Sequence, residues 1–225
     1  MIDHRDIIYF RRRITSWGKS NYMNYPWRET DNMWHSLVAE IMLQKTRLIK
    51  VLRIYDLFIH KYPDAPSFLK SYQKENWNFF ETLGLLKRYE MFIKMTEVIT
   101  TKGMPNSKED FKKLPGVGEY VASAMMSLHF GEREILIDSN ISRFISRFEG
   151  FYHEEKTRKQ KITANYLEKI VPKRNGIKSF NYALLDFSMI VCKPIPNCSN
   201  CMLKRKCASF DKRIDLMNGH IRAGG

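Results

Sequence analysis

Four cysteines stand close together near the C-terminus with the spacing C-x5-C-x2-C-x5-C: Cys192, Cys198, Cys201 and Cys207. The chain has no others, whereas a secreted disulfide framework would scatter its cysteines along the sequence. Four thiolates this close can instead converge on one metal centre, either zinc or a [4Fe–4S] cluster. The neighbouring Lys193 and Lys204–Lys206 favour thiolates because positive charge lowers thiol pKa values. The segment therefore predicts a metal site and leaves the metal open.

A second group of residues surrounds a tight turn. The stretch Leu114-Pro-Gly-Val-Gly118 joins two helix-like segments, and its glycines allow positive φ and a close approach to a partner. The amides of Gly116, Val117 and Gly118, with the N-terminus of the next helix, would form an anion site suited to a DNA phosphate. Taken alone, the segment fits an ordinary helix–helix turn better than an anion site. Tyr120, on the first turn of that helix, is either a packing aromatic or part of a pocket.

Two carboxylates complete the set of candidates. Asp138 precedes an i, i+3, i+4, i+7 pattern that predicts a helix starting at Asp138–Asn140: Ile141, Phe144, Ile145 and Phe148. Asp138 could simply cap that helix. Glu40 lies among apolar residues, yet it also shares the i, i+4, i+7 pattern of one solvated helix face with Gln44 and Arg47. The residue types alone leave both carboxylates open to a structural or a chemical role.

The charge of the chain points to a polyanionic partner. Its 38 Lys+Arg against 24 Asp+Glu give a net charge of +14, and nucleic acid is the commonest partner of such a protein. The basic residues, Lys45 among them, are spread along the sequence, which suits a folded basic surface better than a basic tail. The same charge would also suit a merely basic protein or a membrane-surface binder. Neither a membrane-spanning run nor a secretory signal is recognisable, so we expect a cytoplasmic protein. With a nucleic acid as partner it would be nucleoid-associated, and we expect it to be a monomer.

Helices must position these residues, because strand patterns are sparse. Apolar residues recur at helical spacing from Ser36 to about Ile59, with a bend or two. Tyr62-Pro-Asp-Ala-Pro66 is an expected break, and Ser107-Lys-Glu-Asp110 has the form of a capping box. Further helices are expected on both sides of Gly84 and over 107–114, 119–129, 159–171 and 180–191. With 225 residues, 44% of them hydrophobic, the sequence predicts an all-α protein of about nine to eleven helices.

In combination, these motifs resemble the helix-hairpin-helix glycosylases of the endonuclease III and MutY superfamily. The matching segments span most of the chain: Pro26-Trp-Arg28, Ala39-Glu-Ile-Met-Leu-Gln-Lys-Thr46, Leu83-Gly-Leu85, the Leu114–Gly118 hairpin, Ile137-Asp-Ser-Asn140 and the cysteine loop. The resemblance implies a six-helix domain over 31–136, packed against a domain formed by both chain ends, 1–30 and 137–225, with a DNA-binding cleft between them. It also implies a [4Fe–4S] cluster on the four cysteines. One departure is the first cysteine spacing, with five residues, Lys193 to Asn197, where the family usually has six.

The resemblance also implies roles for single residues. Asp138 is expected to stabilise the positive sugar during base release, with Asn140 anchoring nearby backbone or phosphate. Bifunctional members carry a lysine at the Tyr120 position, so a tyrosine implies release of the base without strand cleavage. Glu40 matches the MutY glutamate that protonates the departing adenine. The expected DNA contacts are Gln44 and Lys45, the hairpin residues Gly116, Val117 and Gly118, and a duplex wedge at Leu85 and Leu86.

Two substrates remain in competition. The segment Glu40–Thr46 resembles MutY, which removes adenine, whereas Asp186-Phe-Ser-Met-Ile-Val-Cys192 resembles the Mig-type enzymes, which remove thymine or uracil opposite guanine. Because the chain stops soon after Cys207, without the further domain of typical MutY proteins, we favour a glycosylase acting on thymine or uracil mispaired in double-stranded DNA. The residues also leave open a non-catalytic DNA-binding protein, or a strand-cutting lyase that uses another amine, such as Lys45 or the N-terminus.

Overall fold

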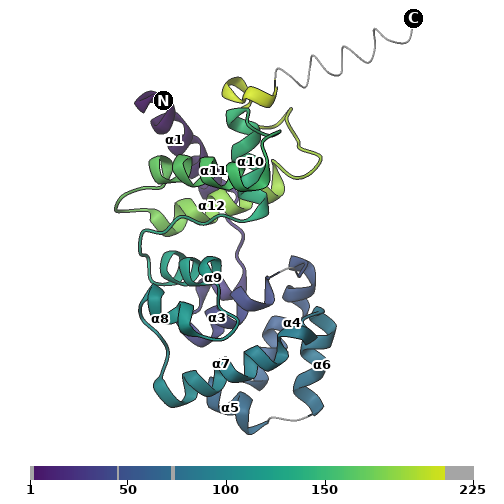
Figure 1. The fold of residues 1–225 in the computed structure, drawn as a ribbon. Coiled ribbons are helices and arrows are strands. Elements are labelled where there is room, and N and C mark those ends of the chain that lie inside the picture. Colours follow the sequence, from purple (N-terminus) through teal and green to yellow (C-terminus); the bar gives the residue numbers. More distant parts are fainter. Residues whose placement is uncertain (1–2, 45, 72–73, 211–225) are drawn as a thin grey trace, which may run out of the picture. The chain divides into compact units, whose positions relative to one another are not determined.

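Helices account for all the regular secondary structure in residues 3–44, 46–71 and 74–210, the part of the chain described by the computed structural model (Figure 1). The chain divides into two units. A central unit comprises Asn24–Glu132, and a terminal unit comprises Met1–Met23 together with Arg133–Gly225. These borders differ slightly from the expected ones, which placed the central domain over 31–136.

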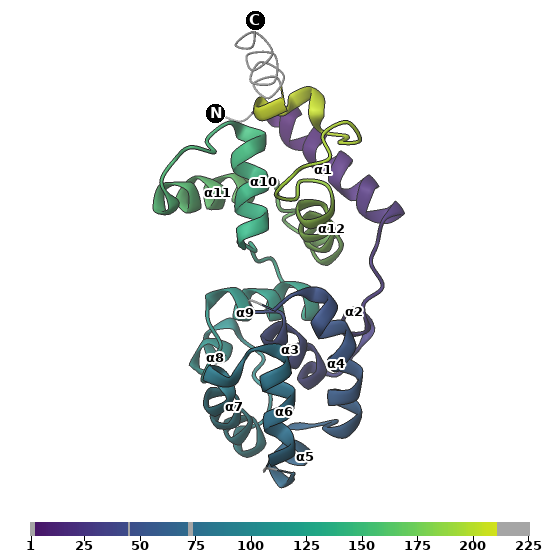
Figure 2. The ribbon, with the colours of Figure 1, turned by 90° about the vertical axis from the view of Figure 1, so that its right-hand side faces the viewer.

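The described residues of the terminal unit form four α-helices, α1 (His4–Ser20), α10 (Ser139–Glu149), α11 (Lys156–Ile170) and α12 (Ile177–Ile190), followed by the 3-10 turn η3 (Lys204–Lys206) (Figure 2). Helix α1 packs closely on α12, because a Cβ at Gly18 would lie only 2.4 Å from Cβ of Ala183. The Phe10 ring of α1 lies 5.7 Å from Phe144 and 5.1 Å from Phe148, both on α10. The N-terminal helix thus shares one aromatic core with the C-terminal half of the chain.

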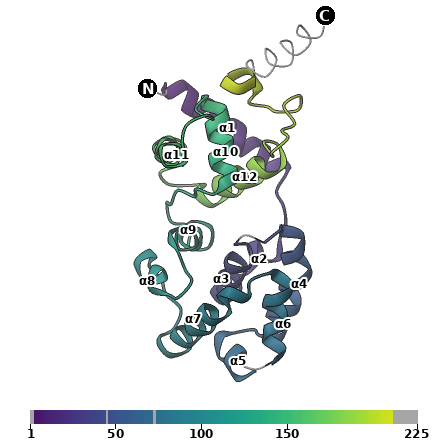
Figure 3. The same ribbon diagram turned by 45° about the vertical axis from the view of Figure 1, so that its right-hand side comes forward.

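The central unit contains the remaining helices (Figure 3). They are α2 (Pro26–Glu29), α3 (Met33–Met42), α4 (Leu48–Lys61), α5 (Ala65–Lys70), α6 (Lys74–Leu83), the 3-10 turn η1 (Leu86–Arg88), α7 (Tyr89–Lys102), α8 (Lys108–Lys113), α9 (Glu119–Ala124) and the π-helical turn η2 (Met125–His129). Its core is aromatic: Phe68 lies 5.8 Å from Phe58 and 5.0 Å from Phe92, ring centre to ring centre.

The all-α prediction is confirmed, with differences in detail. The described residues contain twelve α-helices, because the structure adds the short α2 and α5 and the N-terminal α1. Helix α5 begins inside the expected break at Tyr62–Pro66, since Asp64 and Ser67 form a capping box and Pro66 is tolerated in the first turn. The expected helix over 119–129 is α-helical only to Ala124 and continues as the π turn η2.

None of the helices in the described ranges combines the length and the apolar composition needed to cross a membrane.

Candidate functional site

Asp138 lies at the N-terminus of α10, in the terminal unit, as the sequence predicted. Its Oδ1 accepts a hydrogen bond from the backbone N–H of Ile141 at 2.7 Å, so it does cap the helix. Its Oδ2 accepts from Nδ2 of Asn140 at 3.1 Å. Asp138 is half-buried, and both oxygens are held by neighbouring groups. The cap therefore fixes the carboxylate in place, and the structural role is compatible with a chemical one.

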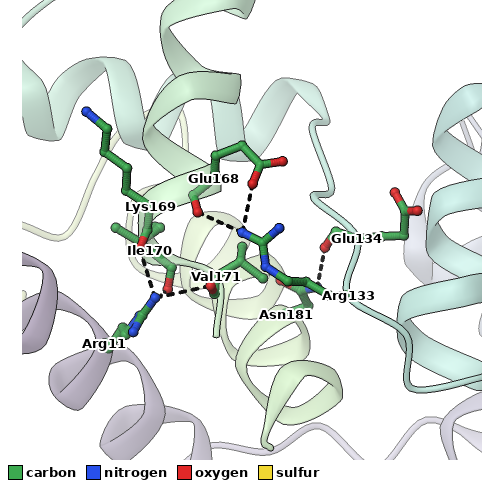
Figure 4. A network of polar contacts seen from close by, with 8 residues as sticks. All are labelled: Arg11, Arg133, Glu134, Glu168, Lys169, Ile170, Val171 and Asn181. Carbon is green, nitrogen blue, oxygen red and sulfur yellow. Dashed lines mark hydrogen bonds and ion pairs between the residues drawn. The ribbon is translucent and has the colours of Figure 1, made fainter. Parts of the chain in front are cut away.

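The segment that leads to Asp138 is tied to its own unit by a polar network (Figure 4). Arg133 donates from Nη2 to the backbone carbonyl of Glu168 at 2.7 Å and forms an ion pair with its carboxylate at 2.8 Å. Asn181 donates from Nδ2 to the carbonyl of Glu134 at 3.0 Å. These contacts join the segment to α11 and α12, so the chain immediately before Asp138 is held at several points.

Arg11 strengthens the same network from α1. Its guanidinium donates to the last carbonyls of α11, at 2.6 Å to Ile170, 2.8 Å to Lys169 and 3.1 Å to Val171 (Figure 4). A cation at a helix C-terminus satisfies carbonyls that have no partner within the helix. Helix α11, to which Arg133 binds, is therefore held in part by α1. Helix α1 was not predicted from the sequence.

All four cysteines line one cavity of about 150 Å³ in the terminal unit. Among the described residues, no three His, Cys, Asp or Glu side chains stand near enough to hold a single metal ion, so the sulfurs surround a cavity and do not meet at a point. Burial raises the pKa of Cys192 and Cys207, and that of Cys201 to about 11. From the basic residues near the cysteines in the sequence, we expected lowered thiol pKa values. The effect of burial is larger than that of these charges, although Arg147 does lower the pKa of Cys192.

Two arginines of α10 hold the first part of the cysteine loop. Arg143 donates to the carbonyl of Cys192 at 3.1 Å and to that of Ser188 at 3.0 Å. Arg147 donates to the carbonyls of Lys193 at 2.8 Å and Pro194 at 2.9 Å, and its Nη1 lies 3.9 Å from Sγ of Cys192. The loop with the shortened spacing is therefore fixed to the helix that Asp138 caps.

The hairpin between α8 and α9 contains the two-glycine turn of the central unit. Gly116 has φ of +80°, which favours glycine, but Gly118 is extended with φ of −95° and serves as the N-cap of α9. Of the residues expected to bind an anion through their amides, Gly116 and Gly118 are exposed, whereas Val117 is buried and its N–H donates to the carbonyl of Leu114 at 3.1 Å. Beside them, Glu119 pairs with Lys108 at 2.7 Å and with Lys112 at 2.8 Å. Tyr120 is half-buried on the first turn of α9.

Glu40 is buried, which contradicts the solvated-face interpretation of its helical pattern. Only 5% of the residue is exposed, and its Oε1 lies 3.5 Å from Nε2 of His129. Gln44, beyond the end of α3, accepts a hydrogen bond from Arg88 and is only partly exposed. Seven other residues of α3 are buried as well, so Glu40 is part of a helix that lies largely inside the central unit.

The two expected wedge residues differ in exposure. Leu85 is 5% exposed and belongs to the core of the central unit, whereas Leu86 is half-exposed. A wedge must be available to enter a duplex, so of the pair only Leu86 remains a candidate. Lys45 lies outside the described residues.

Comparison with known proteins places this chain among DNA repair enzymes, although no protein-family model matches it. It is 31% identical to the thymine/uracil-DNA glycosylase of Methanothermobacter thermautotrophicus, over 88% of this chain and 91% of that protein. It is 32% identical to the thymine-DNA glycosylase of Aeropyrum pernix, over 93% of this chain and 98% of that protein. The chain belongs to the helix-hairpin-helix DNA glycosylases.

Solved structures agree with this family. The structure of a thermostable thymine-DNA glycosylase superposes with a TM-score of 0.83 at 29% identity, covering 92% of this chain and 98% of that one. A non-covalent endonuclease III–DNA complex superposes with a TM-score of 0.79 at 21% identity, covering 96% of this chain and 100% of that one, which supports the fold alone. The adenine DNA glycosylase of Buchnera aphidicola is 28% identical, and the chain spans 61% of its length.

Three residues of this DNA glycosylase that contact the candidate site residues were not predicted from the sequence. Arg143 and Arg147 bind the cysteine loop, and His129 lies beside Glu40. Arg143 and Arg147 lie one turn apart on α10, and their i, i+4 spacing before a cysteine loop was a usable signal. His129 had no comparable signal, because its position depends on the π turn that ends the helix of Tyr120.

Proposed function

We propose that this protein releases thymine, or uracil, mispaired with guanine in double-stranded DNA. One observation carries the proposal: the thymine glycosylases of two organisms match the chain at 31% and 32% identity over 91% and 98% of their own lengths. The fixed carboxylate of Asp138 supplies the group that such a reaction requires.

In the proposed reaction, the bond between C1′ of the sugar and the base nitrogen breaks and positive charge develops on the sugar. The carboxylate of Asp138 stabilises that charge, as carboxylates do in glycosidases. A water oxygen then bonds to C1′, and the water's protons are shared between the new hydroxyl and the departing base. The products are a free base and an abasic site. Because Asn140 and Ile141 already hold Asp138, little reorganisation is needed.

Tyr120 supports a reaction that stops at the abasic site. Strand cleavage through a Schiff base needs an amine that attacks C1′, and a phenol cannot form that intermediate. We assign Tyr120 to the pocket that receives the flipped nucleotide, Glu40 to proton transfer near the base, and Gln44 and Leu86 to the duplex from which the base is removed.

A base-release assay tests the proposal directly. End-labelled duplexes containing G·T, G·U, A·G or A·8-oxoguanine are incubated with the protein and analysed with and without alkali. We expect cleavage of G·T and G·U duplexes only after alkali, and no covalent adduct on borohydride reduction. Strand cleavage without alkali, together with a trapped adduct, would contradict the assignment of Tyr120.

An adenine glycosylase is the second candidate, favoured by the buried Glu40 and by the adenine DNA glycosylases among the relatives. A carboxyl placed beside a departing base can exchange a proton with it. Release of adenine from the A·G or A·8-oxoguanine duplex, with no release of thymine or uracil, would establish this second function in the same assay.

We also propose that the cysteine loop holds a [4Fe–4S] cluster. The residues fit such a group, because four thiols line one cavity and the guanidinium of Arg147 lies beside them. Buried thiols resist ionisation, so thiolates here require a compensating cation within the cavity. Cys192, Cys198, Cys201 and Cys207 would be the ligands. When bound, the cluster would crosslink the loop and so stabilise the terminal unit.

The hairpin glycines give a matched pair of variants for DNA binding. Gly116→Ala would be strained, because φ is +80° and the new Cβ would lie 3.3 Å from Cβ of Met91. We expect it to lower the free energy of unfolding by about 1–2 kcal/mol. Gly118→Ala has no atom within 4 Å of the new Cβ, so the thermal midpoint should stay unchanged.

If the amides around Gly118 receive a phosphate, its added methyl group should weaken binding of a mismatched duplex. Fluorescence anisotropy over a range of salt concentrations measures this, since phosphate contacts make affinity fall steeply with salt. Unchanged affinity of Gly118→Ala would argue against a phosphate contact at the hairpin.

A further inference from the structure

Glu40 and His129 form a buried acid–imidazole pair within the central unit. The Nε2 of His129 lies 3.5 Å from Oε1 of Glu40, and the two side chains are only 2% (His129) and 6% (Glu40) exposed. Burying a carboxyl costs free energy unless it has a partner, and the same holds for an imidazole. Each member of the pair therefore gives the other a polar partner in surroundings shielded from water.

The backbone brings His129 to this position. The helix of Tyr120 changes at Met125 into the π turn η2, where the N–H of Phe130 bonds to the carbonyl of Met125 at 3.1 Å. Each ring of a π turn contains one residue more than an α-helical ring, which rotates the residue at its end. That residue is His129, and η2 packs against α3, the helix of Glu40. π turns of this kind are frequent at functional sites.

We propose that His129 is a positioning residue for Glu40. The imidazole donates its Nε2–H to Oε1 of Glu40, which leaves Oε2 as the oxygen that exchanges a proton near the base. The 3.5 Å separation is long for a hydrogen bond, and we expect it to shorten when the flipped nucleotide binds. This inference rests on the proposed function, in which Glu40 acts on the flipped nucleotide.

The first test is a double-mutant cycle measured by single-turnover base release. His129→Ala should slow release by about 10- to 100-fold, because a misplaced catalytic group loses much of its effect. In the Glu40→Gln background the same change should have almost no further effect, since His129 acts through Glu40. His129→Gln keeps an N–H donor and should recover part of the rate. His60→Ala, an exposed histidine of the same unit, is the control and should leave the rate unchanged.

The second test does not depend on activity. Side-chain nitrogen signals of the six histidines are compared by NMR at one pH in the wild type and in Glu40→Gln. The His129 signal should move and the His60 signal should not. Equal rate losses from His129→Ala in both backgrounds, or a His129 signal insensitive to Glu40→Gln, would overturn the proposal. A wild type that releases neither thymine nor uracil would instead refute the proposed function, and the NMR comparison would still decide the contact.

Discussion

Asp138→Asn should abolish most of the base-release activity and leave the fold intact. Asparagine caps helices as well as aspartate does, so its side-chain oxygen can still accept the hydrogen bond from the N–H of Ile141. It carries no charge, however, and cannot stabilise a positive sugar. We expect single-turnover release from G·T and G·U duplexes to fall by about 10²- to 10⁴-fold.

Two further variants separate the cap from the charge. Asp138→Ala removes both and should add a loss of stability of about 1 kcal/mol. Glu155→Gln is the matched control, because Glu155 caps α11 in the same unit through the N–H of Arg158 at 3.2 Å. It should leave the rate unchanged. If Asp138→Asn released bases at the wild-type rate, Asp138 would be a helix cap only.

Cys198→Ala should remove the metal and destabilise the terminal unit. The cluster would tie four positions of the loop to one another, in the way that a disulfide ties two. The loss of stability should therefore resemble that of a native disulfide, about 2–5 kcal/mol. Purified wild-type protein should be brown and contain iron, and the variant should be colourless and cleaved by protease within 192–207.

Ser199→Ala is a suitable control for the cysteine variant. Ser199 lies in the same loop, is exposed, and bonds only to Asn197 among the contacts that the structure records for its hydroxyl. It should keep its iron and its protease resistance. Wild-type protein that contained zinc in place of iron and was fully active would contradict the cluster assignment.

The parts of this site that sequence predicted are those with a local signal. The start of α10 followed from Asp138 and the apolar spacing behind it, and the structure confirms both. Helix α1 also had such a signal, since Asp3 caps it and Phe10 and Ile14 are buried one turn apart, but it was missed.

Other features depend on packing between distant segments. The spacing of Glu40 with Gln44 and Arg47 fits an exposed face equally well, and only the packing of α3 shows that Glu40 is buried. The burial of Leu85, next to a half-exposed Leu86, likewise has no counterpart in the local sequence. The same holds for the cysteine thiols, whose raised pKa values come from burial that charge patterns do not reveal.

Helix α10 carries Asp138 at its first turn and, further along, the two arginines that hold the cysteine loop. If the loop moved, Arg143 and Arg147 would lose the carbonyl oxygens through which α10 holds the loop. Should the loop hold the proposed cluster, loss of that cluster would act on Asp138 through α10 and lower the rate of base release. In this arrangement the cysteine loop and the Asp138 carboxylate depend on the same helix.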